Sequence, residues 1–293
     1  MFQRILVPLD GSNLSERALP YASFLAQAKG GQVVLMRAID TWATHVDMDE
    51  EAARQPNIEA ELSQLAAGLT SEGVRHTTVS VAFGEAAGLI ESTAASNDID
   101  LIVMSTHGRR GLAKWAYGSV AERVFRLSTR PVLLIPPQTH TTWSIDSGPV
   151  LLPLDGSRVA EQALPFAKNL ARALQAKISV LQVVEPVPIA VGAGTDVVPP
   201  IDYAEWVRAA EPYAADVARR VSGNGVPAVA KTVLGYAAAS IVDEAEALSA
   251  RAIVMASHGR TGVERAVLGS VATGVVQRAS QPVLVVHAAH EPG

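Results

Sequence analysis

The stretch Ile5-Leu-Val-Pro-Leu-Asp-Gly-Ser12 returns later in the same chain as Val150-Leu-Leu-Pro-Leu-Asp-Gly-Ser157. Each copy is a short apolar run followed by Asp-Gly-Ser, a pattern typical of a buried strand that ends in a turn. A strand and turn that occur twice indicate an internal duplication, so the residues behind each copy should match as well.

Further motifs do recur in the same order behind each copy. They are Glu16, Ala18, Leu19, Pro20 and Ala22, which return as Glu161, Ala163, Leu164, Pro165 and Ala167; His107-Gly-Arg109, which returns as His258-Gly-Arg260; Gly118-Ser-Val-Ala121, which returns as Gly269-Ser-Val-Ala272; and Pro131-Val-Leu133, which returns as Pro282-Val-Leu284. The copies lie roughly 150 residues apart, which is a domain length rather than a solenoid repeat. The 293-residue chain is therefore expected to hold one domain twice.

We expect the first domain over residues 1–137, a polar linker over 138–148 and the second domain over 149–288. The second copy is a few residues longer in its middle, and the Pro/Gly-rich stretch 186–202 is the expected place of the insertion. Because the insertion interrupts the symmetry, the two copies need not be equivalent in function.

Composition and charge exclude several classes of protein. The net charge is −5 and neither half is basic, so neither nucleic acid nor an anionic membrane is expected as a partner. The absence of cysteine excludes disulfides, thiolate nucleophiles and zinc–thiolate sites. The apolar run before Pro8 is too short for a secretory signal, and no run approaches the roughly 18 apolar residues of a membrane span. We expect a soluble, cytoplasmic protein.

Within the first copy, apolar runs alternate with stretches of helical periodicity. The expected strands are residues 4–9, 32–39, 74–83, 100–104 and 131–135, and the expected helices are residues 12–28, 59–72, 86–95 and 118–127. This alternation predicts a parallel sheet with helices on both faces, wound outward in two directions. The fold class is therefore α/β, with two doubly wound, Rossmann-like domains of five parallel strands each.

Such sheets bind ligands beyond the carboxyl ends of their strands, where the strand order reverses. The residues expected at these ends are Asp10, Ala38, Gly84 and the loop after Met104, with Asp155, Val183, Gly235 and the loop after Met255 as counterparts. Asp10 and Asp155 could face a ligand, or could only start a turn and cap a helix. Gly84 and Gly235 could make a turn or leave clearance for a ligand.

The loop after Met104 has a composition that suits phosphate. Ser105-Thr-His-Gly108 is followed by nine residues and then by Gly118-Ser119 at the start of a helix, and Ala256-Ser-His-Gly259 precedes Gly269-Ser270 in the same way. Small residues let the backbone approach an anion, and a helix start adds N–H donors and a positive dipole end. Arg109 and Arg260 could meet a phosphate oxygen. The alternative is that these glycines only make a tight turn and a helix cap.

Together, the Pro-Leu-Asp-Gly-Ser strand end, the His-Gly-Arg loop, Gly-Ser-Val-Ala and the closing Pro-Val-Leu strand resemble the universal stress protein family. The resemblance covers nearly all of both copies. It implies a tandem universal stress protein that binds an adenine nucleotide, ATP with or without Mg²⁺, with an internal pseudo-dimer formed through strands 131–135 and 282–286 and a further homodimer.

The resemblance also implies which residues bind the nucleotide. The family pattern of Gly-x-x-Gly, nine residues and Gly-Ser/Thr is matched at its later positions, whereas Ser105 and Ala256 replace the first glycine. Both are small, but neither tolerates a backbone angle that requires glycine. The expected nucleotide-binding residues are Pro8, Asp10, Ala38, Met104, Ser105, Gly108, Arg109, Gly118, Ser119 and Val120 in the first copy, and Pro153, Asp155, Val183, Met255, Ala256, Gly259, Arg260, Gly269, Ser270 and Val271 in the second.

The remaining histidines and tryptophans suggest no chemistry. His107 and His258 have no partner group in their motif, so we expect them to anchor a loop rather than to catalyse. The histidines that do not recur are expected on the surface; they are His45, His76, His140, His287 and His290. The tryptophans are expected to be buried or to lie at an interface; they are Trp42, Trp115, Trp143 and Trp206.

Three functions follow from these observations. The first is a nucleotide-binding regulatory protein, a stress-linked switch with at most weak ATPase activity, since no general base or arginine finger is evident. The second is a nucleotide-free interaction or scaffold protein of the same fold, motivated by Ser105 and Ala256. The third is a hydrolase or nucleotidyl transferase, because related parallel-sheet folds perform both reactions.

Overall fold

The computed structural model of the chain describes residues 1–39, 48–106, 118–139, 143, 148–186, 202–258 and 268–287, with backbone alone for residues 48–54. Its elements alternate between strand and helix in both copies, as the sequence predicts. The first copy contains β1 (Arg4–Pro8), α1 (Asn13–Glu16), α2 (Leu19–Lys29), β2 (Gln32–Ile39), α3 (Met48–Ser71), β3 (His76–Phe83), α4 (Ala86–Ser96), β4 (Leu101–Ser105), α5 (Ser119–Leu127) and β5 (Val132–Ile135).

The second copy repeats this order. It contains β6 (Val150–Leu154), α6 (Arg158–Glu161), α7 (Leu164–Leu174), β7 (Ile178–Val184), α8 (Tyr203–Ser222), β8 (Ala228–Leu234), α9 (Ala237–Ala247), β9 (Ala252–Ala256), α10 (Ser270–Arg278) and β10 (Val283–Val286). The expected insertion at residues 186–202 falls almost entirely outside the described residues.

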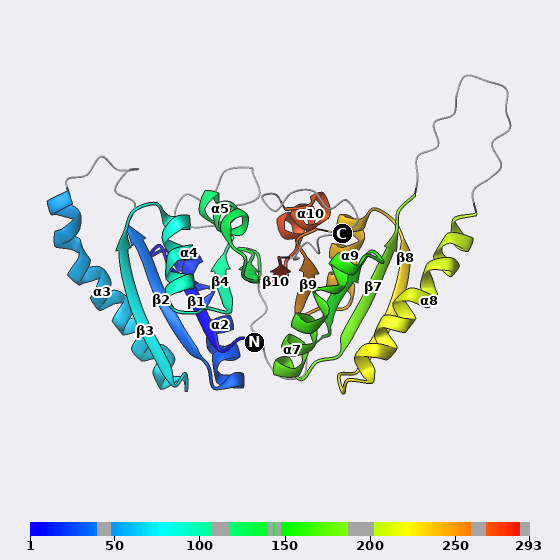
Figure 1. The fold of residues 1–293 in the computed structure, drawn as a ribbon, viewed down its shortest axis with the longest axis horizontal. Coiled ribbons are helices and arrows are strands. Elements are labelled where there is room, and N and C mark those ends of the chain that lie inside the picture. Colours follow the sequence, from blue (N-terminus) through cyan, green and yellow to red (C-terminus); the bar gives the residue numbers. More distant parts are fainter. Residues whose placement is uncertain are drawn as a thin grey trace, which may run out of the picture.

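All ten strands belong to one sheet with the order β3-β2-β1-β4-β5-β10-β9-β6-β7-β8 (Figure 1). Every pair within a copy is parallel, and β5 and β10 pair antiparallel where the copies meet, with Leu133 opposite Leu284. The expected contact between the last strands of the two copies is therefore present in the structure. In each copy the order reverses beside the first strand, between β1 and β4 and between β6 and β9, as expected for doubly wound sheets.

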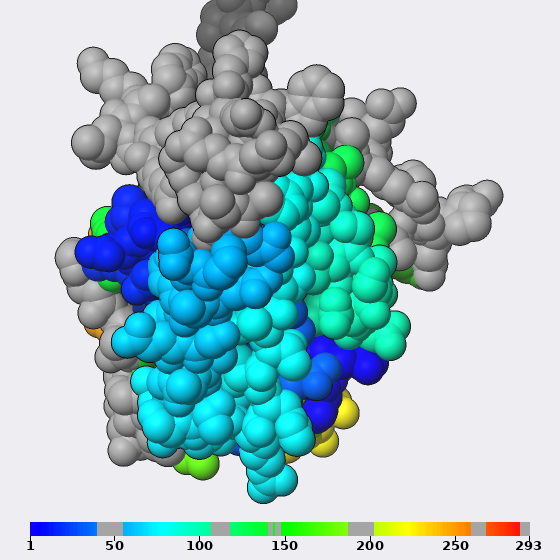
Figure 2. All heavy atoms as spheres, turned by 90° about the vertical axis from the view of Figure 1, so that its left-hand side faces the viewer, coloured from blue at the N-terminus to red at the C-terminus, as the bar shows by residue number. Residues whose placement is uncertain are grey.

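Helices cover both faces of this sheet. Successive strand residues point to opposite faces, so Val7 packs beneath α2 and α3, whereas Leu6 packs beneath α4 and α5. Helices α7 and α8 share the first face, and α9 and α10 share the second. Figure 2 shows α3 across the near side of the first copy. Within the described residues, no helix combines the length and the apolar character needed to cross a membrane.

Two helices differ from the expected boundaries. The helix expected over residues 12–28 is divided into α1 and α2, because Pro20 lacks the N–H that would continue the helix and instead occupies its first turn. The same interruption occurs before Pro165 in the second copy. Helix α3 begins at Met48 rather than Glu59 and contains Pro56.

Trp143, between the two copies, is buried against both. Its ring meets Tyr21 and Phe24 of α2 edge-on, at centroid distances of 5.0 and 5.8 Å. Its indole Nε1 donates a 2.8 Å hydrogen bond to the carbonyl of Arg251, just before β9. The side chain therefore connects the helix layer of the first copy to the sheet of the second. Trp206, in contrast, is 38% exposed on α8.

Candidate functional site

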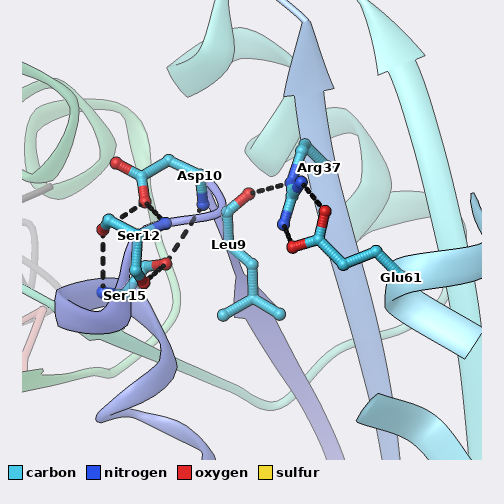
Figure 3. Close-up of polar contacts among 6 residues, drawn as sticks. All are labelled: Leu9, Asp10, Ser12, Ser15, Arg37 and Glu61. Atoms are coloured by element: carbon cyan, nitrogen blue, oxygen red, sulfur yellow. Dashed lines mark hydrogen bonds and ion pairs between the residues drawn. The ribbon is translucent and has the colours of Figure 1, made fainter. Parts of the chain in front are cut away.

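The carboxyl ends of β1 and β4 lie beside each other at the point where the strand order reverses. Asp10 follows β1, and its Oδ1 accepts hydrogen bonds from the Ser12 amide at 3.0 Å and the Ser12 hydroxyl at 2.6 Å (Figure 3). Ser12 in turn caps α1 by accepting from the Ser15 amide at 3.2 Å. Asp10 thus orders the turn through Ser12, which is the residue that caps the helix.

The second copy builds the same turn. Asp155 Oδ1 accepts from the Ser157 amide at 2.9 Å and from its hydroxyl at 2.6 Å, and the Ser157 hydroxyl accepts from the Ala160 amide at 3.1 Å. The turn-forming role of both aspartates is therefore present in the structure. In Figure 3 the other carboxylate oxygen of Asp10 points away from this turn.

A buried arginine holds the chain just before Asp10. Arg37 of β2 is 4% exposed, and its Nε donates to the Leu9 carbonyl at 3.2 Å. Its two terminal nitrogens donate to the two carboxylate oxygens of Glu61 on α3, each at 2.9 Å (Figure 3). Sequence reasoning did not identify this pair, although a lone cation within the apolar strand over residues 32–39 was the available signal. In the second copy, Gln182 occupies the position of Arg37.

The Arg37–Glu61 pair predicts non-additive substitutions. Glu61→Gln leaves the buried guanidinium without a countercharge, so we expect a loss of about 1–2 kcal/mol in unfolding free energy, moderated because Glu61 is half-exposed. Adding Arg37→Met removes that charge, so the double variant should cost less than the sum of the single variants. Urea denaturation of the four proteins measures the coupling; strictly additive losses would contradict it.

The two residues that replace the family's first glycine end their strands in extended conformation. Ser105 is 7% exposed at the end of β4, and Ala256 is 7% exposed at the end of β9. Neither has a positive φ. Their backbone therefore has a conformation open to any residue, and the substitution adds a buried Cβ without backbone strain.

The chain returns to these strand ends at the start of α5 and α10. The Gly118 amide donates to the Thr106 carbonyl at 2.7 Å, and the Gly269 amide donates to the Ser257 carbonyl at 2.9 Å. A Cβ at Gly269 would lie 3.0 Å from the Ser257 carbonyl oxygen, so glycine permits this close return. The amides of these two glycines are used within the fold.

The first turns of α5 and α10 begin with exposed residues. Ser119 and Ser270 are exposed as the first helical residues, Val120 is 37% exposed and Val271 is half-buried. The amides of a first helical turn have no partner inside their own helix. Each copy therefore presents a serine hydroxyl and helix N-terminal amides close to the end of its β4 or β9 strand.

The other expected site residues lie at or outside these strand ends. Pro8, Ala38, Met104, Pro153, Val183 and Met255 are buried or half-buried in the last residues of β1, β2, β4, β6, β7 and β9. Gly108, Arg109, Gly259 and Arg260 lie outside the described residues. The structure thus brings together the aspartates, strand ends and helix starts of the expected set.

The glycine after β3 is required by its turn, and the glycine after β8 lies close to a serine side chain. Gly84 has a φ of +136°, a conformation that favours glycine, and a Cβ at Gly235 would lie 2.3 Å from the Ser240 hydroxyl. Glu85 caps α4 by accepting from the amides of Ala87 and Gly88 at 3.0 and 2.8 Å. Burial acts to raise the pKa of Glu85, but these hydrogen bonds and the Arg123 guanidinium outweigh it and lower the pKa.

Both copies of the duplicated architecture match the same known protein family. The profile described as the universal stress protein family matches residues 1–136 and again residues 147–287. The chain belongs to the universal stress protein family. Because the family profile matches each copy, the chain is a tandem member of that family.

Individual relatives in the universal stress protein family are distant. Universal stress protein Rv2005c of Mycobacterium tuberculosis is 30% identical over 199 residues, which are 65% of this chain and 62% of that protein. Universal stress protein Slr1230 of Synechocystis sp. is 24% identical over 96% of this chain and 99% of its own length. The crystal structure of a universal stress protein from Archaeoglobus fulgidus has a TM-score of 0.74 at 21% identity, covering 98% of this chain and 99% of that one, which shows a common fold.

One histidine expected on the surface of this family member is instead partly buried where the copies meet. The His287 ring, at the end of β10, stacks on Phe125 of α5 with a centroid distance of 4.4 Å. Burial, with a smaller contribution from His258, lowers the pKa of His287 from 6.5 to about 4. The surface prediction for His287 is wrong because α5 of the other copy covers it. His76 is exposed as expected, and His45, His140 and His290 lie outside the described residues.

His287 gives the fold a pH dependence of known sign. The unfolded chain takes up this proton near pH 6.5 and the folded chain only near pH 4, so stability is present above pH 6.5 and is lost as pH falls toward 4. We expect a contribution of up to about 3 kcal/mol. His287→Phe keeps an aromatic ring against Phe125 and removes the titrating group, so the wild type should lose stability relative to the variant from pH 7 to pH 5 in urea denaturation. A difference independent of pH would contradict the expectation.

The described residues contain no cluster of three or more acidic or histidine side chains that could hold a metal ion. In both copies the polar groups at the strand ends are a carboxylate, a serine hydroxyl and helix N-terminal amides. This set can bind an anion chiefly through N–H and O–H donors.

Proposed function

We propose that this chain is a stress-response regulatory protein that binds an adenine nucleotide, ATP, at the carboxyl ends of its strands and acts as a nucleotide-dependent switch. The observation that carries the proposal occurs in both copies. The Asp10 or Asp155 turn, the end of β4 or β9 and the exposed serine that begins α5 or α10 converge where the strand order reverses.

In the proposed complex, the phosphates lie against the first turn of α5 or α10, where Ser119 or Ser270 adds a hydroxyl donor. The nucleoside lies toward Ala38 or Val183, and Asp10 or Asp155 is the carboxylate nearest to the ribose or to a Mg²⁺–phosphate unit. The proposed site also includes Gly108 and Arg109, or Gly259 and Arg260. At most, slow hydrolysis accompanies binding.

The first test is direct. The protein is purified without added nucleotide and denatured, and the supernatant is separated by anion-exchange chromatography; isothermal titration with ATP follows. We expect ATP or ADP at about one or two molecules per chain. An empty supernatant together with no heat at millimolar ATP would refute the proposal and favour a nucleotide-free interaction protein.

Charge-matched variants then assign the copy that binds. Ser119→Glu and Ser270→Glu each place a carboxylate at a helix N-terminus, which suits the helix dipole but repels phosphate. Each variant should remove the binding due to its own copy. Ser92→Glu adds the same charge to an exposed position of α4 and should leave ATP binding unchanged.

The oligomeric state belongs to the same proposal. β5 and β10 already pair within the chain, so a homodimer would use other surfaces, and we propose one in the cytoplasm with adenine nucleotide as the small-molecule partner. Sedimentation of the wild-type protein at several concentrations tests the homodimer.

A further inference from the structure

The first copy has a groove between α2 and α3, on the side where Figure 2 shows α3. The groove has a volume of about 590 Å³, within the size range of ligand sites. Leu19, Leu65 and Leu69 contribute its apolar wall. Its polar residues include three carboxylates, Glu16, Glu61 and Glu72. The groove uses none of the residues proposed to bind nucleotide, although Glu61 reaches the chain before Asp10 through Arg37.

The three carboxylates differ in their partners. Glu61 is paired with Arg37, and Glu72 accepts a 3.0 Å hydrogen bond from the Ser23 hydroxyl. The Glu16 backbone amide donates to the Ser12 carbonyl, but its carboxylate, on α1, makes no hydrogen bond or ion pair within the part of the chain that the structure describes. The groove therefore carries an excess of negative charge, on Glu16 and on Glu72, whose partner is a neutral hydroxyl.

The second copy shows what the same place can hold. Glu161 is the repeat of Glu16, and its Oε2 accepts a 3.0 Å hydrogen bond from the guanidinium of Arg220 on α8. Its Oε1 accepts a 3.0 Å hydrogen bond from the Tyr213 hydroxyl. The contact with Glu161 is the first cause of the raised pKa of Arg220. In this copy, α8 itself supplies a cation to the repeated glutamate.

The first copy lacks that cation. Alignment of α3 with α8 on Gly73-Val74 and Gly225-Val226 superimposes the buried Leu69 on Val221 and places Gly68 where Arg220 stands. A Cβ added to Gly68 would meet nothing within 4 Å. The groove is therefore open at the position from which the arginine side chain of the second copy starts.

We propose that this groove receives an arginine side chain from a segment of a protein partner, with its guanidinium on Glu16 and its methylenes along Leu65 and Leu69. The charge of the groove is complementary to a guanidinium, and the apolar wall suits the stem of arginine. In the second copy the guanidinium on the repeated glutamate belongs to a polypeptide, helix α8, and the apolar wall of the first-copy groove suits apolar residues that flank an arginine.

The test uses a capped five-residue peptide with a central arginine, flanking alanines and terminal leucines. Its twin carries neutral citrulline, which has nearly the same shape. At low ionic strength, the arginine peptide should shift the backbone amide resonances of Gly68 and Leu69 in a saturable manner, and the twin should bind at least about tenfold more weakly. Equal binding of the two peptides, or no shift at millimolar peptide, would overturn the proposal.

Three variants sharpen the assignment. Glu16→Gln should weaken binding of the arginine peptide about threefold to tenfold. Gly68→Arg supplies the side chain found in the second copy and should abolish binding of the arginine peptide. Binding is followed by the shift of the Leu69 amide resonance. The variant adds a side chain and deletes none. Glu246→Gln, the same charge change at an exposed position of α9, should leave binding unchanged.

Two results would contradict particular parts of the proposal. Unchanged binding in Gly68→Arg would exclude this groove as the site. Agmatine is a free alkylguanidinium. If it binds as tightly as the arginine peptide, the assignment to a protein segment is overturned. Neither result depends on whether the protein binds ATP.

Discussion

Trp143→Ala should lower the unfolding free energy by about 3–5 kcal/mol, the usual cost of deleting a buried large aromatic side chain. The deletion removes the contacts with Tyr21 and Phe24 and leaves the Arg251 carbonyl without its indole donor. Because the ring lies between the two copies, the variant should also weaken their mutual stabilisation. Urea denaturation followed by circular dichroism measures the loss, and a broadened or divided transition would report the uncoupling.

Two companion variants separate the contributions of Trp143. Trp143→Phe keeps most of the packing and loses the hydrogen bond, so it should cost about 1–2 kcal/mol. Trp206→Ala deletes an indole that is 38% exposed on α8 and should cost less than about 1 kcal/mol. Equal losses in Trp143→Ala and Trp206→Ala would show that Trp143 does not connect the copies.

Gly148→Ala should cost about 3–5 kcal/mol, because two separate requirements for glycine coincide at this position. Its φ is +59°, and a Cβ there would lie 1.9 Å from the carbonyl oxygen of Ser249. The obstructing atom is backbone, so no rotamer change relieves the overlap. The turn that carries Ser249 leads into β9, and its displacement should disturb the bond from the Arg251 amide to the Pro149 carbonyl. Thermal and urea denaturation of the wild type and Gly148→Ala measure this loss of unfolding free energy.

Other glycines provide matched controls for Gly148. Gly225 has a φ of +78° with nothing within 4 Å of an added Cβ, so Gly225→Ala should cost only about 1–2 kcal/mol for the backbone conformation. Gly68→Ala, in a helix and in open space, should stabilise by up to about 1 kcal/mol. If Gly148→Ala and Gly225→Ala cost the same, the overlap with Ser249 has no energetic effect.

Local patterns in the sequence were sufficient to predict the order of the strands and helices. Apolar runs and helical periodicity are encoded within short segments, so the expected boundaries of β2 and α4 agree with the structure to within one residue. The repeat predicted the pseudo-dimer, and the family resemblance identified the strands that join it. The sequence also contains a local signal for the break between α1 and α2, which the expected helix over residues 12–28 did not include. That signal is Pro20.

Contacts between distant segments were not predictable in this way. His287 looks like a surface residue at the end of its own strand, and its ring packs on Phe125 of α5 in the other copy. Glu61 is an ordinary helix residue until the register of α3 on the sheet places it beside Arg37. The strand ends and helix starts of the candidate site follow from topology, whereas the side-chain partners of Asp10 depend on the conformation of one turn.

The antiparallel β5–β10 pair joins two halves that one polypeptide also links covalently. Each half therefore meets the other at a fixed effective concentration, and dilution cannot separate them as it would separate two free subunits. A substitution in one half is never forced onto the other, in contrast to a homodimer, in which every change occurs twice. The chain can thus hold Arg220 on one side and Gly68 on the other, and two such halves can differ in ligand while sharing one sheet.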